Sequence, residues 1–153
     1  MKIQELRIGN IVMVDNPKYH PRLDGIPLRV TGFEERVISS RSDHVVRLEH
    51  IKQKPNSFYE SYSQFLKFIK PITLTEEILL KCGFEKDDTG VDMFDPDYAE
   101  WYQMEFPVIG ILCQSSDKKY LFDENTDTLR IQYLHQLQNL FFDLTGEELE
   151  VEL

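Results

Sequence analysis

The chain has 153 residues and a net charge of −10 at pH 7, and 41% of its residues are hydrophobic, 12% aromatic and 29% charged. This is the composition of an ordinary globular protein, and it excludes disordered and fibrous chains. A chain of this length forms one domain, or two small subdomains that share a core, without needing disulfides or metals for stability.

The charge is divided unevenly along the chain. Residues 1–71 contain 12 Lys and Arg against 8 Asp and Glu, and residues 72–153 contain 5 against 19, which gives +4 and −14. Either the two parts attract each other or simply differ in surface, or the basic part has an anionic partner. We expect a boundary at Pro71 between subdomains 1–71 and 72–153, which together form one compact unit.

The start of the chain places Lys2, Glu5 and Arg7 where a signal peptide would have its apolar stretch, and no later run approaches the roughly 18 apolar residues of a membrane span. The cysteines, Cys82 and Cys113, lack any spacing typical of metal sites. We therefore expect a cytoplasmic protein with reduced, buried thiols, no membrane association, no metal and no cofactor.

Four short runs rich in β-branched residues lie between Leu6 and Ile51. Turn-forming residues separate them, among them Asp24-Gly25, Gly32 and Ser42-Asp43. Short strands of this kind can hide their edges by closing on one another, so the pattern predicts an SH3-like small β-barrel. The expected strands cover 11–14, 28–30, 36–38 and 45–48.

A long connection from Asp15 to Pro27 interrupts these strands and contains Tyr19, His20 and Arg22 together with several prolines. We expect an irregular loop over the barrel surface. Such a loop often carries binding residues, but it could equally be a packed crossover without a ligand.

Residues 52–70 have the pattern of an insertion. Ser57-Phe58-Tyr59-Glu60 matches a capping box, and Phe58, Tyr62, Phe65 and Leu66 recur at helical spacing. The pattern predicts a short helix near 57–66, whose aromatic residues either join the core or form a partner-binding face.

The next helix has clear signals at both ends. Thr75 can cap it, Glu76 and Glu77 meet its positive end, and Gly83 can end it in the left-handed conformation. Strands are then expected at 91–94, 101–106, 108–113 and 119–122 as an antiparallel meander. An apolar stripe at helical spacing predicts a helix over 133–144 that ends at Gly146, and alternation at 149–153 predicts a final edge strand.

No phosphate loop, dinucleotide fingerprint, nucleophile elbow or zinc helix is present in the sequence. His44 and His50 would lie about 20 Å apart on one strand, at about 3.3 Å per residue, too far for one ion. His135 beside the apolar stripe is better explained as a structural histidine than as a base. The acidic run from Asp87 to Glu100 lacks the spacing of a calcium loop.

Three blocks stand out: Leu6-Arg7-Ile8-Gly9-Asn10, the segment from Pro71 to Phe84, and the segment from His135 to Leu149. They resemble an uncharacterised family of small proteins common in Bacteroides-type gut bacteria and their phages or mobile elements. That family has no established activity, so the resemblance implies an intact domain in a cytosolic setting without implying a reaction.

The sequence therefore predicts an α+β fold, with an SH3-like small barrel followed by a helix and an antiparallel meander packed by a C-terminal helix. The leading hypothesis is a non-enzymatic binding or adaptor protein with a protein partner. Nucleic acid could instead bind the basic part, where the candidates are Arg29, Arg36, Arg41, Arg47, Lys52 and Lys54.

Two alternatives stay open. Trp101 and Tyr102, beside the acidic run, could form an exposed recognition patch, and the acidic part could then imitate nucleic acid and inhibit a DNA-binding enzyme. The protein could also be an enzyme whose active-site residues are scattered along the chain.

Overall fold

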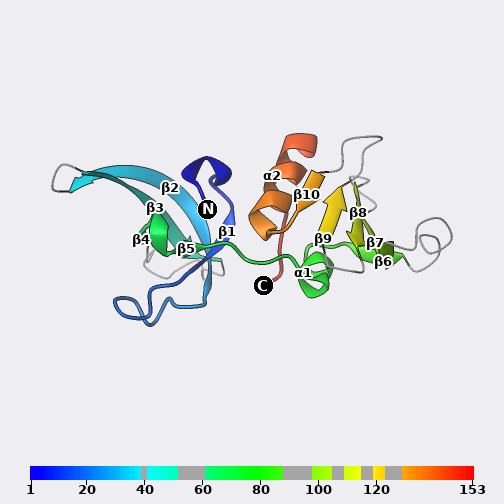
Figure 1. Ribbon diagram of the computed structural model, residues 1–153, viewed down its shortest axis with the longest axis horizontal. Coiled ribbons are helices and arrows are strands. Elements are labelled where there is room, and N and C mark those ends of the chain that lie inside the picture. The colour runs from blue at the N-terminus through cyan, green and yellow to red at the C-terminus, as the bar shows by residue number, and fades with distance from the viewer. Residues whose placement is uncertain (39–40, 52–60, 88–97, 105–108, 115–118, 123–128) are drawn as a thin grey trace, which may run out of the picture. The chain divides into compact units, whose positions relative to one another are not determined.

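The computed structural model describes residues 1–38, 41–51, 61–87, 98–104, 109–114, 119–122 and 129–153. The fold is mixed α+β, mostly antiparallel sheet with a C-terminal helix, as predicted (Figure 1). The chain divides into two compact units, Met1–Ile72 and Thr73–Leu153, and each contains its own five-stranded sheet. In the part of the chain that the structure describes, no helix is long and apolar enough to cross a membrane.

The sheet of the first unit has the strand order β4-β3-β2-β1-β5, and all neighbouring strands are antiparallel. Two 3-10 turns accompany it, η1 (Ile3–Glu5) before β1 and η2 (Leu66–Phe68) between β4 and β5. The strands are β1 (Ile11–Val14), β2 (Pro27–Ile38), β3 (Arg41–His50), β4 (Tyr62–Phe65) and β5 (Ile69–Lys70).

The prediction of two strands at 28–30 and 36–38 is wrong, because β2 runs continuously through both. Gly32 does not form a turn. The register with β3 shifts between Val30 and Gly32, so this region is a bulge that lets one long strand bend. The long β2–β3 pair is visible as the extended ribbon in Figure 1.

The predicted helix near 57–66 is also wrong over its described residues. Tyr62–Phe65 is strand β4, and residues 52–60 lie outside the described part. Tyr62 pairs with Leu48 and Gln64 with Val46, so the segment joins the sheet beside β3. Gln64 is buried while its neighbour Ser63 is exposed, which is the period of a strand. Pairing with a distant strand therefore prevails over the local helical spacing.

The core of the first unit lies along the inner face of this sheet. Its centre consists of side chains from β1, β2 and β3, and Leu23 joins it from the loop between β1 and β2. Burying each such side chain stabilises the fold by about 1.5–3 kcal/mol. The strand residues are Val12, Val14, Leu28, Val30, Val46 and Leu48.

The second unit contains a sheet of order β10-β9-β8-β7-β6, again antiparallel throughout. Helix α1 (Glu76–Lys81) precedes it and helix α2 (Leu134–Thr145) follows it. The strands are β6 (Glu85–Asp87), β7 (Tyr98–Met104), β8 (Ile109–Gln114), β9 (Lys119–Phe122) and β10 (Leu129–Ile131). The strand expected at 91–94 lies outside the described residues.

Both ends of α1 match the sequence signals. The Thr75 hydroxyl accepts a hydrogen bond from the Ile78 N–H at 3.3 Å. At the other end Gly83 has φ 85°, and the Phe84 N–H donates to the Leu79 carbonyl at 3.1 Å, which closes a Schellman motif. The predicted helix is confirmed, as is the end of α2 at Gly146, whose φ is 76°.

The predicted final strand at 149–153 is wrong. Leu149 is buried, but the backbone of this segment makes no ladder, and the Glu152 N–H donates instead to the Lys81 carbonyl at 3.1 Å. The apolar and acidic alternation thus reflects anchoring of the chain by Leu149 rather than membership of a sheet.

Candidate functional site

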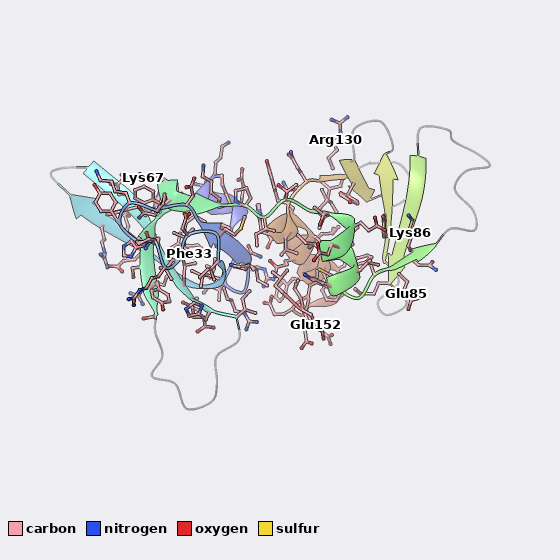
Figure 2. The ribbon with its side chains drawn as sticks, turned by 90° about the horizontal axis from the view of Figure 1, so that it is seen from below. Phe33, Lys67, Glu85, Lys86, Arg130 and Glu152 are labelled. Atoms are coloured by element: carbon pink, nitrogen blue, oxygen red, sulfur yellow. The ribbon has the colours of Figure 1, made fainter. Side chains whose placement is uncertain are left out.

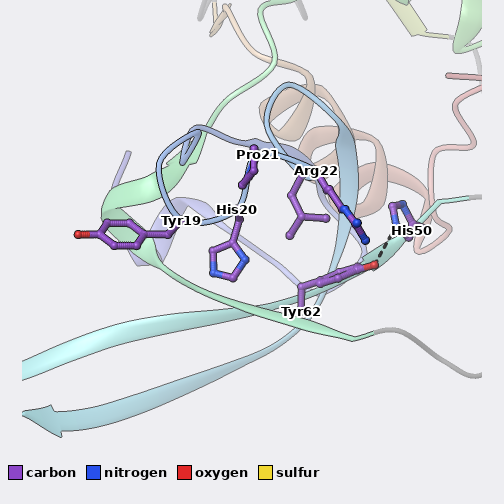
Figure 3. Close-up of a pocket in the computed structure, with 7 residues that line it drawn as sticks. Tyr19, His20, Pro21, Arg22, His50 and Tyr62 are labelled. Carbon is purple, nitrogen blue, oxygen red and sulfur yellow. Dashed lines mark hydrogen bonds between the residues drawn. The ribbon is translucent and has the colours of Figure 1, made fainter.

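A pocket of about 430 Å³ lies in the first unit, between the β1–β2 loop and the adjoining ends of β3 and β4 (Figure 3). The loop supplies five consecutive lining residues, and β3 and β4 supply one each. The lining residues are Tyr19, His20, Pro21, Arg22, Leu23, His50 and Tyr62.

Asn16 holds the first half of this loop in place. Its carbonyl accepts hydrogen bonds from the N–H groups of Tyr19 at 3.3 Å and His20 at 2.8 Å. Its side-chain amide donates to Gln64 Oε1 at 3.2 Å, and both side chains are buried. A buried amide pair of this kind is costly to break, because each partner would lose its hydrogen bond in a low-dielectric interior. The loop is thereby fixed to β4.

Leu23 holds the second half. Its side chain is only 4% exposed and packs in the core, while its N–H donates to the His20 carbonyl at 3.0 Å. Two residues later Gly25 adopts φ 71° and donates to the Val14 carbonyl at 3.1 Å. The exposed residues 19–22 therefore lie between two anchors, and such a loop loses little conformational entropy when it binds a ligand.

The opposite wall is the pair formed by His50 and Tyr62. The His50 Nε2 and the Tyr62 hydroxyl are 3.1 Å apart, and the two rings meet edge to face with centroids 5.3 Å apart. Both positions are set by strand pairing, since His50 lies opposite Leu28 and Tyr62 lies opposite Leu48. Tyr62 also packs against the core, so the wall is rigid.

Arg22 gives the pocket a positive charge, and none of the described lining residues is a carboxylate. The two acids of the loop are engaged elsewhere: Asp24 accepts the Asn16 N–H at 3.2 Å, and Asp15 pairs with Lys70 at 3.3 Å. Among the described residues the Arg22 side chain has neither an ion-pair nor a hydrogen-bond partner. Figure 3 shows this side chain extending toward the His50–Tyr62 pair, while Tyr19 points away from it.

Guanidinium, imidazole and phenol groups together form a donor set that suits an anion. Ser, Thr and Cys are absent from the part of the lining that the structure describes. No three His, Cys, Asp or Glu side chains gather as a metal site anywhere in the described segments. The described lining residues can bind and orient an anionic group.

The predicted basic candidates whose side chains the structure describes, Arg29, Arg36 and Arg47, do not line this pocket. Arg36 Nε lies 3.0 Å from Glu34, and Arg47 lies 3.4 Å from the same carboxylate. The hydrogen bond from Arg36 lowers the pKa of the Glu34 carboxyl below its ordinary value. Arg29 stands opposite Glu49 in the β2–β3 register. Arg41 begins β3 with its side chain outside the described residues, as are Lys52 and Lys54.

The predicted patch in the second unit needs a correction. Tyr102 is 0% exposed and meets Tyr120 at a ring-centroid distance of 6.2 Å, so it is a core residue and cannot belong to an exposed patch. The next residue, Gln103, is exposed, so Tyr102 lies on the buried face of the sheet. The side chain of Trp101 lies outside the described residues.

The other histidines and the described cysteine have structural surroundings. His135 is 1% exposed and stacks on Tyr133 with a centroid distance of 5.8 Å, in keeping with a structural role. His44 is exposed on β3, opposite Glu35. Cys82 is buried, and burial raises the pKa of its thiol to about 12, so it is a core residue as predicted.

A second cavity of about 280 Å³ lies beside η2 and the start of β3. Its lining includes charged side chains of both signs, Asp43 and Lys67. Lys67, labelled in Figure 2, lies over the rings of Phe65 and Phe68 at 5.4 and 5.0 Å. This ammonium is already engaged with aromatic faces, so the cavity offers a weaker anion site than the loop pocket.

Sequence reasoning drew attention to the β1–β2 loop but missed the residues that complete the pocket. From the sequence alone, His50 stands out only as a possible metal ligand and Tyr62 only as part of a helical stripe. Their meeting with Arg22 depends on the β3–β4 pairing, for which the sequence contains no local signal. Comparisons with family models, with curated proteins and with solved structures find no match for this chain.

Proposed function

We propose that this is a non-enzymatic binding protein whose first unit holds an anionic ligand in the pocket between the β1–β2 loop and the His50–Tyr62 pair. One observation carries the proposal: Arg22, His20 and His50 line a single pocket, and no carboxylate is among its described lining residues. Each donor is supported by backbone anchors or strand pairing, so the site is formed before the ligand arrives.

The first unit is proposed to be an SH3-like small barrel. Three features support this: the fifth strand pairs with the first, β2 bends at the Val30/Gly32 bulge, and a 3-10 turn joins β4 to β5. A bent strand can take part in both halves of a curled sheet. Loops on such a rigid scaffold are where binding residues usually lie.

Membership of the uncharacterised Bacteroides-type family, and a cytoplasmic setting, are part of the same proposal. The three sequence blocks that resemble the family contain turn and helix-end residues. They include Gly9 at φ 96°, the capped helix α1, and α2 with its end at Gly146. The residues shared with the family cap or end helices and are not catalytic, which is consistent with a binding role.

The proposal can be tested by adding inorganic phosphate to the ¹⁵N-labelled protein and recording its backbone NMR spectrum. We expect saturable shifts at residues 19–23 and in the neighbourhood of His50 and Tyr62. Arg22→Ala should weaken phosphate binding about 10-fold, because a charge-assisted hydrogen bond is lost.

The matched control is Arg36→Ala, which removes an arginine that is paired with Glu34 outside the pocket. It should leave phosphate binding unchanged. Equal losses in the two variants, or shifts that do not saturate, would show that the interaction is a diffuse attraction to the basic unit and would refute the pocket.

A further inference from the structure

We infer that the ligand of this pocket is single-stranded nucleic acid, with a phosphate on Arg22 and an unstacked base against the aromatic wall. The inference rests on the proposed anion-binding function and adds the class of ligand. Arg22 lines the same pocket as the rings of His20, His50 and Tyr62.

The aromatic wall is what separates a nucleotide from a simple anion. Tyr62 is fixed by its packing on the core and by its contact with His50, so its ring is a rigid surface. Bases stack on such rings whatever their sequence, and each stacked base commonly improves binding by about 5- to 150-fold. Binding of phosphate alone does not require planar ring surfaces, whereas binding of a base does.

The shape of the site favours a single strand over a duplex. A pocket of about 430 Å³ is in the size range of small-molecule sites, large enough for one flipped-out nucleotide. In a duplex the bases remain stacked on one another and only the backbone could approach. A duplex would therefore contact Arg22 but leave the aromatic wall empty.

One further cationic side chain adjoins the lining residues of the pocket. Lys18 lies over the Tyr19 ring, with Nζ 5.0 Å from its centroid, at the start of the exposed loop. The residues up to Pro71 carry a net +4 in a chain of net −10. A strand leaving the pocket would thus meet further positive charge.

The test uses the full-length protein and fluorescein-labelled strands of ten nucleotides, oligo(dT) and oligo(U), in anisotropy titrations at low salt. We expect either strand to bind at least about 10-fold more tightly than a ten-base-pair duplex. The two strands differ in the 2′-hydroxyl and thymine methyl groups, so their ratio reports whether RNA or DNA is preferred.

Tyr62 supplies a matched pair of variants. Tyr62→Phe keeps the ring and loses only the hydroxyl contact with His50, so most of the affinity should remain. Tyr62→Leu removes the ring and should lower affinity about 10-fold. Because Tyr62 packs on the core, circular dichroism must show that the leucine variant is folded. Exposed Arg22→Ala provides the independent check, since it should lower the slope of log affinity against log salt by about one.

Failure of this inference is distinct from failure of the proposed function. If phosphate shifts the pocket residues but single strands bind no more tightly than duplex, the site binds anions and the nucleic-acid inference is wrong. A phosphoserine peptide that binds more tightly than the strands would also overturn it. If neither phosphate nor the strands affect residues 19–23, both proposals are wrong.

Discussion

Asn16 orders the pocket loop through its carbonyl and ties the loop to β4 through its side chain. We predict that Asn16→Ala lowers the free energy of unfolding by about 1–3 kcal/mol, since the buried Gln64 carbonyl loses its donor. Urea denaturation measures this. The double change Asn16→Leu with Gln64→Leu should lower the free energy of unfolding by less than the sum of the two single leucine changes. Simple additivity would show that the two side chains are not coupled.

Cys82 allows a prediction about reactivity. Burial raises the pKa of its thiol to about 12, so almost no thiolate exists in the folded protein at pH 8. In a Cys113→Ser background, a thiol reagent should modify Cys82 only as fast as the protein opens, and at once in denaturant. Stoichiometric labelling of the native protein within the mixing time would contradict the buried environment.

The same thiol should also affect stability at high pH. Its folded pKa lies above the ordinary value of 9.0, so the unfolded chain loses the proton first. The stabilising contribution of the protonated Cys82 thiol to the free energy of unfolding is complete below pH 9. It is lost as pH rises toward 12, by about 1.4 kcal/mol for each pH unit. Cys82→Ala should remove this part of the pH slope.

Among the elements, α1 was predictable from sequence because its signals are local. Thr75 and Gly83 lie at its ends, and each acts within a few residues of its position. The strand β4 was missed for the opposite reason: Tyr62 and Gln64 are placed by pairing with β3. Gly32 was misread as a turn because a bulge and a turn use the same residue, and only the register distinguishes them.

The cap of α1 supports an element-scale prediction. Thr75→Ala removes the acceptor of the Ile78 N–H and should lower the free energy of unfolding by about 1 kcal/mol. Thr75→Ser keeps the hydroxyl and should cost a few tenths of that. Thermal or urea unfolding of the two variants gives the comparison, and equal losses would mean that the hydroxyl is not acting as a cap.

At the scale of the whole molecule, the candidate site was the least predictable feature. Its residues come from the β1–β2 loop, the end of β3 and the start of β4, segments that only the folded sheet brings together. The sequence indicated a basic part, yet the structure engages Arg36 and Arg47 with Glu34 and leaves Arg22 available. Charge counts distinguish the basic first unit, and only the folded geometry shows the proposed pocket.

The division into two units predicts that the first can fold alone. Residues 1–72 contain a five-stranded sheet and a hydrophobic core of their own, which includes Leu23. Expressed separately, this segment should show a cooperative thermal transition and native-like amide dispersion by NMR. A non-cooperative melt would show that the first unit depends on residues 73–153 for its stability.

The most direct measurement is a crystal structure of the full-length protein with uridine monophosphate, which supplies one phosphate and one base. The account predicts the phosphate within hydrogen-bonding distance of the Arg22 guanidinium and the uracil ring against Tyr62. A nucleotide bound instead along β2 and β3 at Arg36 and Arg47, with the loop pocket empty, would contradict it.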